Sequence, residues 1–97
     1  MTRVVLMPAA LTDLERIRDF LHMHDPDNTE ERIDELIAAL DVLMHAPEIG
    51  RRAGGRYREL VIGRAARGYV ARYEYAPRID TAFVMQVRHQ RESHRPR

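Results

Sequence analysis

The sequence contains neither lysine nor cysteine among its 97 residues. Without cysteine the chain has no disulfide bond, no thiolate nucleophile and no cysteine ligand for a metal. Without lysine it has no side-chain amine that can act as a base or as a nucleophile. Long apolar runs are also absent, since none approaches the roughly 20 residues that a membrane-spanning helix needs. The apolar stretch near the N-terminus is too short for a signal peptide, so we expect a cytoplasmic protein.

Arginine is the only strongly basic residue, and its 16 copies are unevenly placed. Residues 1–50 hold 4 arginines and 11 acidic residues, a formal charge of −7. Residues 51–97 hold 12 arginines and 4 acidic residues, a formal charge of +8. Guanidinium groups favour bidentate binding of carboxylate or phosphate. The sequence therefore predicts an acidic half joined to a basic half that suits an anionic partner.

The acidic half predicts one strand and two helices. Residues 3–7 are mostly β-branched and apolar, and they stop at Pro8, which suits the first turn of a helix. Leucine and isoleucine then recur at helical spacing, which predicts one helix over residues 8–22 and a second over residues 27–45. The breaker residues 24–28 separate them, so we expect an antiparallel helical hairpin.

The basic half predicts strands, because its apolar period changes from about 3.6 residues to about 2. The strands are expected at residues 56–62, 69–75 and 79–89. Short turns at 63–68 and 76–78 make neighbouring strands antiparallel. In the last strand one face is predicted to carry Ile79, Phe83, Met85 and Val87.

These elements predict a single domain over residues 1–97 of the α+β class, in the order β-α-α-β-β-β. The helical hairpin is expected to pack on one face of an antiparallel sheet. Residues 48–55 are predicted to form a loop rich in glycine and arginine, and residues 91–97 a flexible tail. We expect no cofactor and no metal, because His22 and His24 at a helix end point apart and no second ligand cluster accompanies them.

Short motifs in this order carry a family resemblance. They are Ala10-x-x-Asp13-Leu14-x-x-Ile17, Pro47-Glu48-Ile49-Gly50-Arg51, Arg58-Glu59-Leu60, Gly68-Tyr69 with Tyr73, and Val87-Arg88-His89-Gln90-Arg91-Glu92. Together they resemble the RelE/ParE superfamily of toxins from type II toxin–antitoxin systems. The resemblance covers residues 3–92 and implies the fold derived above.

The resemblance also implies two kinds of activity and a shared partner. RelE-like toxins cut messenger RNA on the ribosome, whereas ParE-like toxins inhibit DNA gyrase and are often called plasmid-stabilisation proteins. Both arrest growth until a cognate antitoxin wraps the toxin with its C-terminal segment, while its N-terminal part commonly binds DNA. We therefore expect a toxin–antitoxin hetero-oligomer with the antitoxin across the helical hairpin and the sheet edge.

The residues present favour the ParE-like activity. The RelE pattern supplies lysine and arginine on the sheet, with a tyrosine near the C-terminus for proton transfer. This chain has no lysine, Val70 follows Tyr69 where RelE-like chains commonly have arginine, and no tyrosine follows Tyr75. A gyrase inhibitor that works by binding is therefore the leading hypothesis.

Two alternatives remain open. Some relatives use a histidine late in the last strand with a glutamate, so the candidate residues for a ribosome-dependent endoribonuclease are His89, Glu59, Arg72 and Arg91. By alternation, however, His89 is expected on the helix-covered side with Val87. The third hypothesis is a non-toxic binding module. Under each of these hypotheses, the candidate partner-binding residues are Arg56, Arg58, Arg72, Arg88 and Arg91.

Two further patterns in the basic half have a functional and a structural interpretation. Four tyrosines interleave with the arginines, at Tyr57, Tyr69, Tyr73 and Tyr75. They suit base stacking, but tyrosines in such strands more often pack beneath helices or pair across the sheet. Gly54-Gly55 and the neighbouring arginines suit an anion-binding nest, with a flexible loop as the simpler interpretation.

Overall fold

The structure is a computed structural model that describes residues 1–63 and 68–90. The helices are α1 (Pro8–His24) and α2 (Thr29–Leu40), and the strands are β1 (Arg3–Leu6), β2 (Arg51–Arg52), β3 (Tyr57–Ile62), β4 (Tyr69–Ala76) and β5 (Thr81–His89). Short 3-10 turns cover Pro26–Asn28, Asp41–Met44 and Pro77–Ile79. Part of the predicted turn 63–68 and the predicted tail 91–97 lie outside the described residues.

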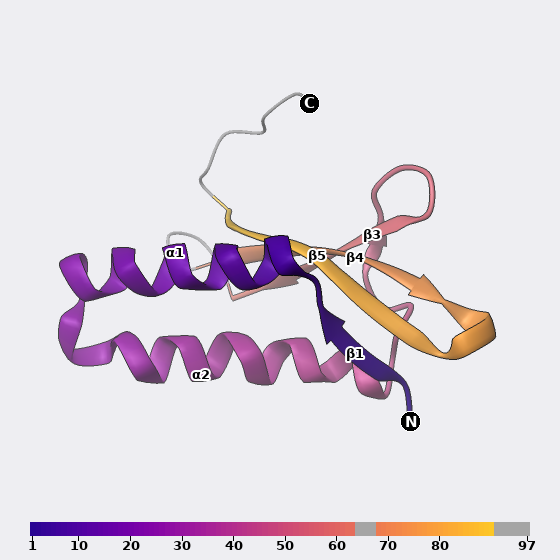
Figure 1. Cartoon of the computed structure of the whole chain (residues 1–97), viewed down its shortest axis with the longest axis horizontal. Coiled ribbons are helices and arrows are strands. Elements are labelled where there is room, and N and C mark those ends of the chain that lie inside the picture. The colour runs from indigo at the N-terminus through magenta and orange to yellow at the C-terminus, as the bar shows by residue number, and fades with distance from the viewer. Residues whose placement is uncertain (64–67, 91–97) are drawn as a thin grey trace.

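The predicted helical hairpin is confirmed. Helices α1 and α2 run antiparallel beside each other and lie against the sheet (Figure 1). Helix α2 is shorter than its periodic pattern predicted, because the last turn tightens into the 3-10 segment Asp41–Met44. Among the described residues, no helix combines the length and the apolar character needed to cross a membrane.

The sheet has five strands in the order β1-β5-β4-β3-β2. Short connections pair β3 with β4 and β4 with β5 in antiparallel fashion, as predicted, and β2 pairs antiparallel with β3. Strand β1 instead pairs with β5 in parallel, so the sheet is mixed. A parallel pair needs a long connection, and the chain between β1 and the other strands contains both helices. Strand β2 has only two residues, and both lie in the segment predicted as a loop.

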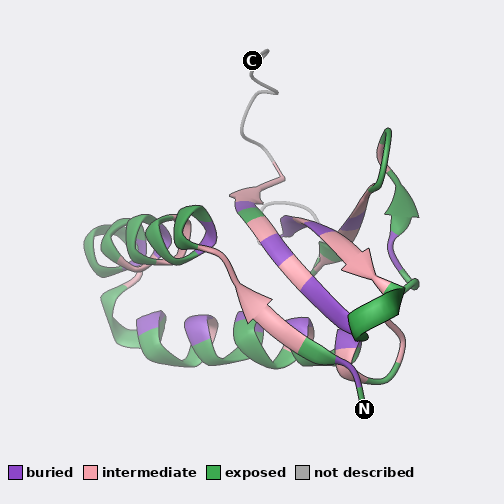
Figure 2. Cartoon of the chain, turned by 45° about the vertical axis from the view of Figure 1, so that its right-hand side comes forward, coloured by how far each residue is buried: buried purple, intermediate pink, exposed green. Residues whose placement is uncertain are grey.

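Alternation along the strands gives the sheet one covered face and one open face. The covered face packs against apolar residues from both helices, among them Ile17, Leu21, Ile33 and Leu36. Strand β4 contributes the fully buried Ala71 and Tyr73 to it. Figure 2 shows the buried positions on the inner sides of the helices and along the central strands. We call the opposite side the open face, since no helix within residues 1–63 and 68–90 covers it.

A bulge in β5 changes which of its residues are buried. Arg72 pairs with Gln86 whereas the next residue of β4 pairs with Val84, so Met85 is the extra residue. Val84 and Val87 are both fully buried as a result. The predicted face was therefore right for Val87 and wrong for Met85, which is only half-buried. A bulge shifts the phase of alternation by one residue.

The other predicted members of that face also differ in the structure. Phe83 pairs with Glu74 and lies on the open face by alternation, and it is half-buried. Ile79 is 62% exposed because it belongs to the turn Pro77–Ile79 and not to β5. The assumption of regular alternation therefore assigns the correct face only to residues on the C-terminal side of the bulge.

Two polar contacts tie the elements together. The Asp13 carboxylate on α1 accepts a hydrogen bond of 2.8 Å from the Val87 amide of β5. The buried Tyr73 hydroxyl accepts one of 2.9 Å from the Gly50 amide, and burial raises the pKa of Tyr73. A Cβ at Gly50 would lie 2.7 Å from the Tyr73 ring, so only glycine fits there. The loop before β2 is therefore held against the sheet.

Candidate functional site

Three arginines converge on one glutamate at the open face. The Glu59 side chain of β3 is only 9% exposed, and it lies between arginines from three other strands. Arg51 Nη2 is 3.4 Å from Oε1, and Arg72 and Arg88 place Nη2 atoms 3.3 and 3.7 Å from Oε2. Strand pairing explains the convergence, because Arg51 and Arg72 are both register partners of Glu59. We call these four residues the arginine cluster.

The arginine cluster keeps an excess of positive charge. One carboxylate faces three guanidinium groups, and the nitrogen–oxygen distances exceed the 2.7–2.9 Å typical of strong charge-assisted hydrogen bonds. Each guanidinium has five N–H donors, so donors remain for an anionic group from solution. Arg72 is also held over the Tyr57 ring, 5.9 Å from its centroid. The arrangement suits binding of a carboxylate or a phosphate.

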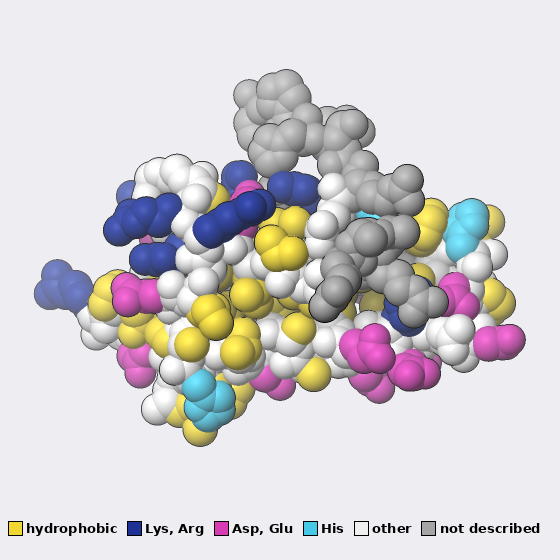
Figure 3. All heavy atoms as spheres, turned by 180° about the vertical axis from the view of Figure 1, so that it is seen from behind, with side chains coloured by type: hydrophobic (Ala, Val, Ile, Leu, Met, Phe, Trp, Pro, Cys, Tyr) yellow, Lys and Arg dark blue, Asp and Glu magenta, His cyan; other side chains and the backbone are white. Residues whose placement is uncertain are grey.

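The surface around the cluster repeats the division of charge found along the sequence. Figure 3 shows the dark blue arginine side chains gathered over the sheet, whereas acidic side chains follow the lower edge where α2 lies. Exposed acidic residues of α2 include Glu30, Glu31, Asp34 and Glu35. The basic sheet and the acidic hairpin are therefore separate surfaces of the folded chain.

His89 and Glu59 are not brought together. His89 is the register partner of Tyr69, and the two rings meet edge-on at 5.3 Å. Tyr69 is buried in the core, so His89 lies on the covered side, as its alternation predicted. Glu59 lies on the open face, and both its oxygens face arginines. This geometry separates the two residues that would have to share proton transfer.

The other predicted arginines have different surroundings. Arg56 is 73% exposed and forms a 3.5 Å ion pair with Glu74. Arg58 donates hydrogen bonds to the backbone oxygens of Glu48 and Gly50, at 3.1 and 2.9 Å. Arg58 therefore anchors a loop, and Arg91 lies outside the described residues. Arg51 is absent from the predicted site, because the short strand that contains it lies in a segment predicted as a loop.

Most of the tyrosines face the covered side. Tyr69 and Tyr73 are buried, and the Tyr75 hydroxyl donates a 2.8 Å hydrogen bond to Asp80. Only Tyr57 joins the arginine cluster, where it lies beneath Arg72. Among the described residues, no three histidine or acidic side chains are grouped to hold a metal ion.

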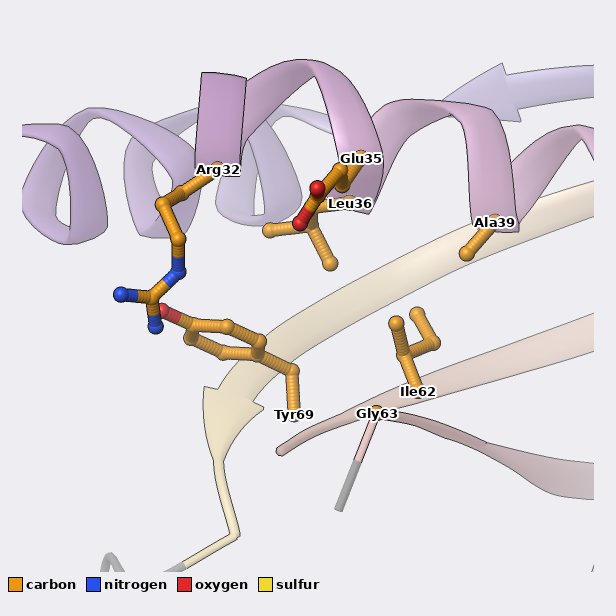
Figure 4. A pocket seen from close by; sticks show the side chains of 7 residues that line it. All are labelled: Arg32, Glu35, Leu36, Ala39, Ile62, Gly63 and Tyr69. Atoms are coloured by element: carbon orange, nitrogen blue, oxygen red, sulfur yellow. The ribbon is translucent and has the colours of Figure 1, made fainter. Parts of the chain in front are cut away.

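A pocket of about 430 Å³ lies between α2 and the adjoining ends of β3 and β4 (Figure 4). Leu36, Ala39 and Ile62 supply apolar walls, and the Tyr69 ring borders the same space. Arg32 lies at its rim, where it also pairs with Asp25 at 3.0 Å. The sequence offered no signal for this pocket, since its walls come from separate elements. Its size and lining suit an apolar side chain.

Comparisons with known proteins give one family match and two curated relatives. Residues 4–94 match the family described as the ParE toxin of type II toxin-antitoxin system, parDE. Toxin RelE3 of Caulobacter vibrioides is 32% identical over 92 residues, which cover 95% of this chain and 98% of that protein. Toxin RelE2 of the same organism is 35% identical over 89 residues, or 92% and 96% of the two chains.

A solved structure shares the fold. It is described as the chromosomal ParDE TA system from P. aeruginosa, and it superimposes with a TM-score of 0.77 at 15% identity. The likeness covers 92% of this chain and 96% of the other. It shows that the two chains share this fold.

Proposed function

The chain belongs to the ParE toxin family of type II toxin–antitoxin systems, and from this premise we propose that it inhibits DNA gyrase. On this proposal the toxin acts in the cytoplasm, arrests growth by binding its target and catalyses no reaction itself. A cognate antitoxin neutralises it.

The separation of His89 from Glu59 is the observation that carries the proposal. Cleavage of RNA through a ribose hydroxyl needs a base and an acid within hydrogen-bond reach of the reacting oxygens. His89 packs against Tyr69 on the covered side, while Glu59 faces the open side. Both Glu59 oxygens also interact with arginines, which hold the carboxylate in place. The open face therefore offers arginines that can bind an anionic partner, whereas the two candidates for proton transfer lie on opposite faces of the sheet.

The arginine cluster supports a contact with an anionic protein surface. Arg72 and Arg88 are partly exposed on the open face, and their charge is only partly balanced by Glu59. Complementary charge of this kind speeds association and selects partners. We place the target contact on this face, with Arg72 and Arg88 at its centre.

The antitoxin is proposed to contact the helical hairpin and the sheet edge. Exposed apolar side chains on the helices are Leu11, Phe20, Met23 and Ile37. They supply an apolar surface, the pocket lined by Leu36 and Ile62 receives one apolar anchor, and acidic antitoxin groups face the arginines. The N-terminal part of the antitoxin is proposed to bind DNA. If the affinity of the complex did not fall with added salt, the electrostatic part of this contact would be wrong.

A RelE-like endoribonuclease is the second candidate. Both Caulobacter vibrioides relatives bear the name RelE, and the arginine cluster has the donors to hold phosphates. In this alternative Arg72 binds the RNA backbone and His89 must reach a proton from the covered side. Substitution of His89 alone therefore tests this alternative.

The experiment compares both activities on the same purified toxin. We expect loss of DNA supercoiling by gyrase and accumulation of cleaved DNA–gyrase complexes, with transcripts on translating ribosomes left intact. Arg72→Ala/Arg88→Ala should weaken the inhibition at least tenfold, whereas the exposed Arg78→Ala should not. Unchanged gyrase activity at stoichiometric excess would reject the proposal.

The same preparation tests the alternatives. Transcript cleavage that disappears in His89→Ala would establish the endoribonuclease instead. Normal growth on expression without antitoxin, together with inactivity in both assays, would support the non-toxic binding module.

A further inference from the structure

The hairpin that joins β2 to β3 projects from the edge of the sheet. Its tip is closed by hydrogen bonds of 3.0 Å from the Ala53 amide to the Tyr57 oxygen and from the Tyr57 amide to the Gly54 oxygen. Gly54 and Gly55 turn the chain with φ angles of 99° and 55°, a region that favours glycine. The two views in Figures 1 and 2 show this ribbon standing clear of the helices. Residues 51–58 thus form a narrow two-stranded ribbon.

This ribbon carries four arginines and no acidic residue. They are Arg51, Arg52, Arg56 and Arg58. Arg58 is used at the base, where it binds backbone oxygens, so it is not offered to a partner. Arg51 points to the open face, as its ion pair with Glu59 shows. By alternation the exposed Arg52 points to the other side of the ribbon.

We propose that this ribbon inserts into the major groove of duplex DNA, with Arg51, Arg52 and Arg56 on the phosphates. The major groove of B-DNA, about 12 Å wide, admits a two-stranded β-ribbon, whereas the major groove of A-form RNA is too deep and narrow. Arg51 and Arg52 on opposite sides match phosphates on both walls of the groove, and Arg56 near the tip, 73% exposed although it pairs with Glu74, keeps N–H donors for a further phosphate. Ala53, Gly54 and Gly55 at the tip carry no base-reading group, so the contact is independent of sequence.

This contact lies outside the proposed gyrase inhibition and does not depend on it. It adds DNA to the surfaces that the toxin binds, through residues at the sheet edge and not through Arg72 or Arg88. A toxin that failed to inhibit gyrase would still bind DNA, and a toxin that failed to bind DNA would still be a candidate gyrase inhibitor. The two proposals therefore fail separately.

The test is fluorescence anisotropy of a labelled 24-base-pair duplex, titrated with the full chain at several salt concentrations. In Arg52→Ala/Arg56→Ala we expect affinity at 50 mM salt to fall at least tenfold. The slope of log affinity against log salt should fall by about 1.8, because each phosphate contact contributes about 0.9. In Arg52→Lys/Arg56→Lys the slope should be retained, since lysine neutralises phosphate equally.

The matched control removes the same charge elsewhere. Arg3→Ala/Arg78→Ala changes two exposed arginines, one on the opposite edge strand β1 and one in the turn before β5. We expect less than a twofold loss of affinity for this variant. An equal loss of DNA affinity in the two alanine variants would show that net charge alone explains the effect, and would overturn the proposal. Equal affinity for duplex RNA, or no binding of DNA at 50 mM salt, would overturn it as well.

Discussion

The helical hairpin and the open face of the sheet are organised by different forces. Helices α1 and α2 contact the sheet through apolar side chains such as Ile17, Leu36 and Leu40, which are almost fully buried. The open face is organised by one carboxylate, Glu59, and the arginines around it. The difference teaches that most apolar packing lies on one side of the sheet, whereas the charged groups that could bind a partner lie on the other. Substitutions on one surface should leave the other largely intact.

The largest expected effect is in the helical half. Leu36 on α2 is 2% exposed, so Leu36→Ala removes packed apolar volume and should lower the free energy of unfolding by about 2–5 kcal/mol. Ile37, the next residue, is 39% exposed, and Ile37→Ala should cost less than about 1 kcal/mol. Urea unfolding of both variants measures the difference. Similar losses would show that α2 is not held by its buried face.

A smaller effect is expected where the two halves meet. Asp13→Ala removes the carboxylate that accepts the hydrogen bond from the Val87 amide, and should cost about 1.5–3 kcal/mol. Glu15 is exposed on the same helix, and Glu15→Ala serves as the control. Hydrogen exchange at the Val87 amide should accelerate only in the first variant. Unchanged exchange there would contradict a direct link between α1 and β5.

The open face should respond to charge and salt. Glu59→Gln leaves three arginines without their counter-ion, and should lower the free energy of unfolding by about 1–3 kcal/mol. Added salt screens the remaining repulsion and should restore part of the loss. Glu48→Gln, at an exposed position, should show no such salt dependence. Thermal unfolding between low and high salt decides the question, and a salt-independent loss in Glu59→Gln would point to packing instead.

The smallest effect concerns the turn before β5. Hydrogen bonds from Thr2 and Tyr75 to the Asp80 carboxylate lower the pKa of Asp80. A carboxyl whose pKa is lowered by folding adds stability above its unfolded pKa of about 3.9, and this is lost as the pH falls through the folded value. The melting temperature of the natural chain should therefore fall more between pH 5 and pH 2 than that of Asp80→Asn. Parallel curves would show that Asp80 does not contribute.

Periodicity predicted the elements of this fold well. The helical hairpin, the strands and the α+β class were indicated by the apolar spacing in α1 and α2 and by the alternation in β3 and β4. Each of these patterns is local, because the buried face of an element sets the period of its own apolar residues. The parallel pairing of β1 and the two-residue strand β2 could not be predicted this way. Both depend on which strands become neighbours, which short local patterns do not record.

The candidate site was predicted only in part. Glu59, Arg72 and Arg88 were recognised as polar residues of the basic strands, and the structure brings them together. Arg51 was missed, because its contribution depends on a register partnership with Glu59. Arg58 could not be recognised as a loop anchor, since its acceptors are backbone oxygens ten and eight residues away. Composition predicts the charge of a surface, while register decides which charges meet.

The bulge at Met85 has a consequence for how proteins with this fold can diverge. If β5 kept all its residues but alternated regularly onward from the buried Val84, Gln86 and Arg88 would turn toward the helices, and His89 would turn to the open face. The bulge at Met85 therefore keeps the Arg88 guanidinium on the open face and the His89 imidazole on the covered side. Deletion of the Met85 codon would remove the bulge but keep Val87 and His89 on the covered side and Arg88 on the open face, so the bulge absorbs a one-residue change in the length of β5 without exchanging its faces.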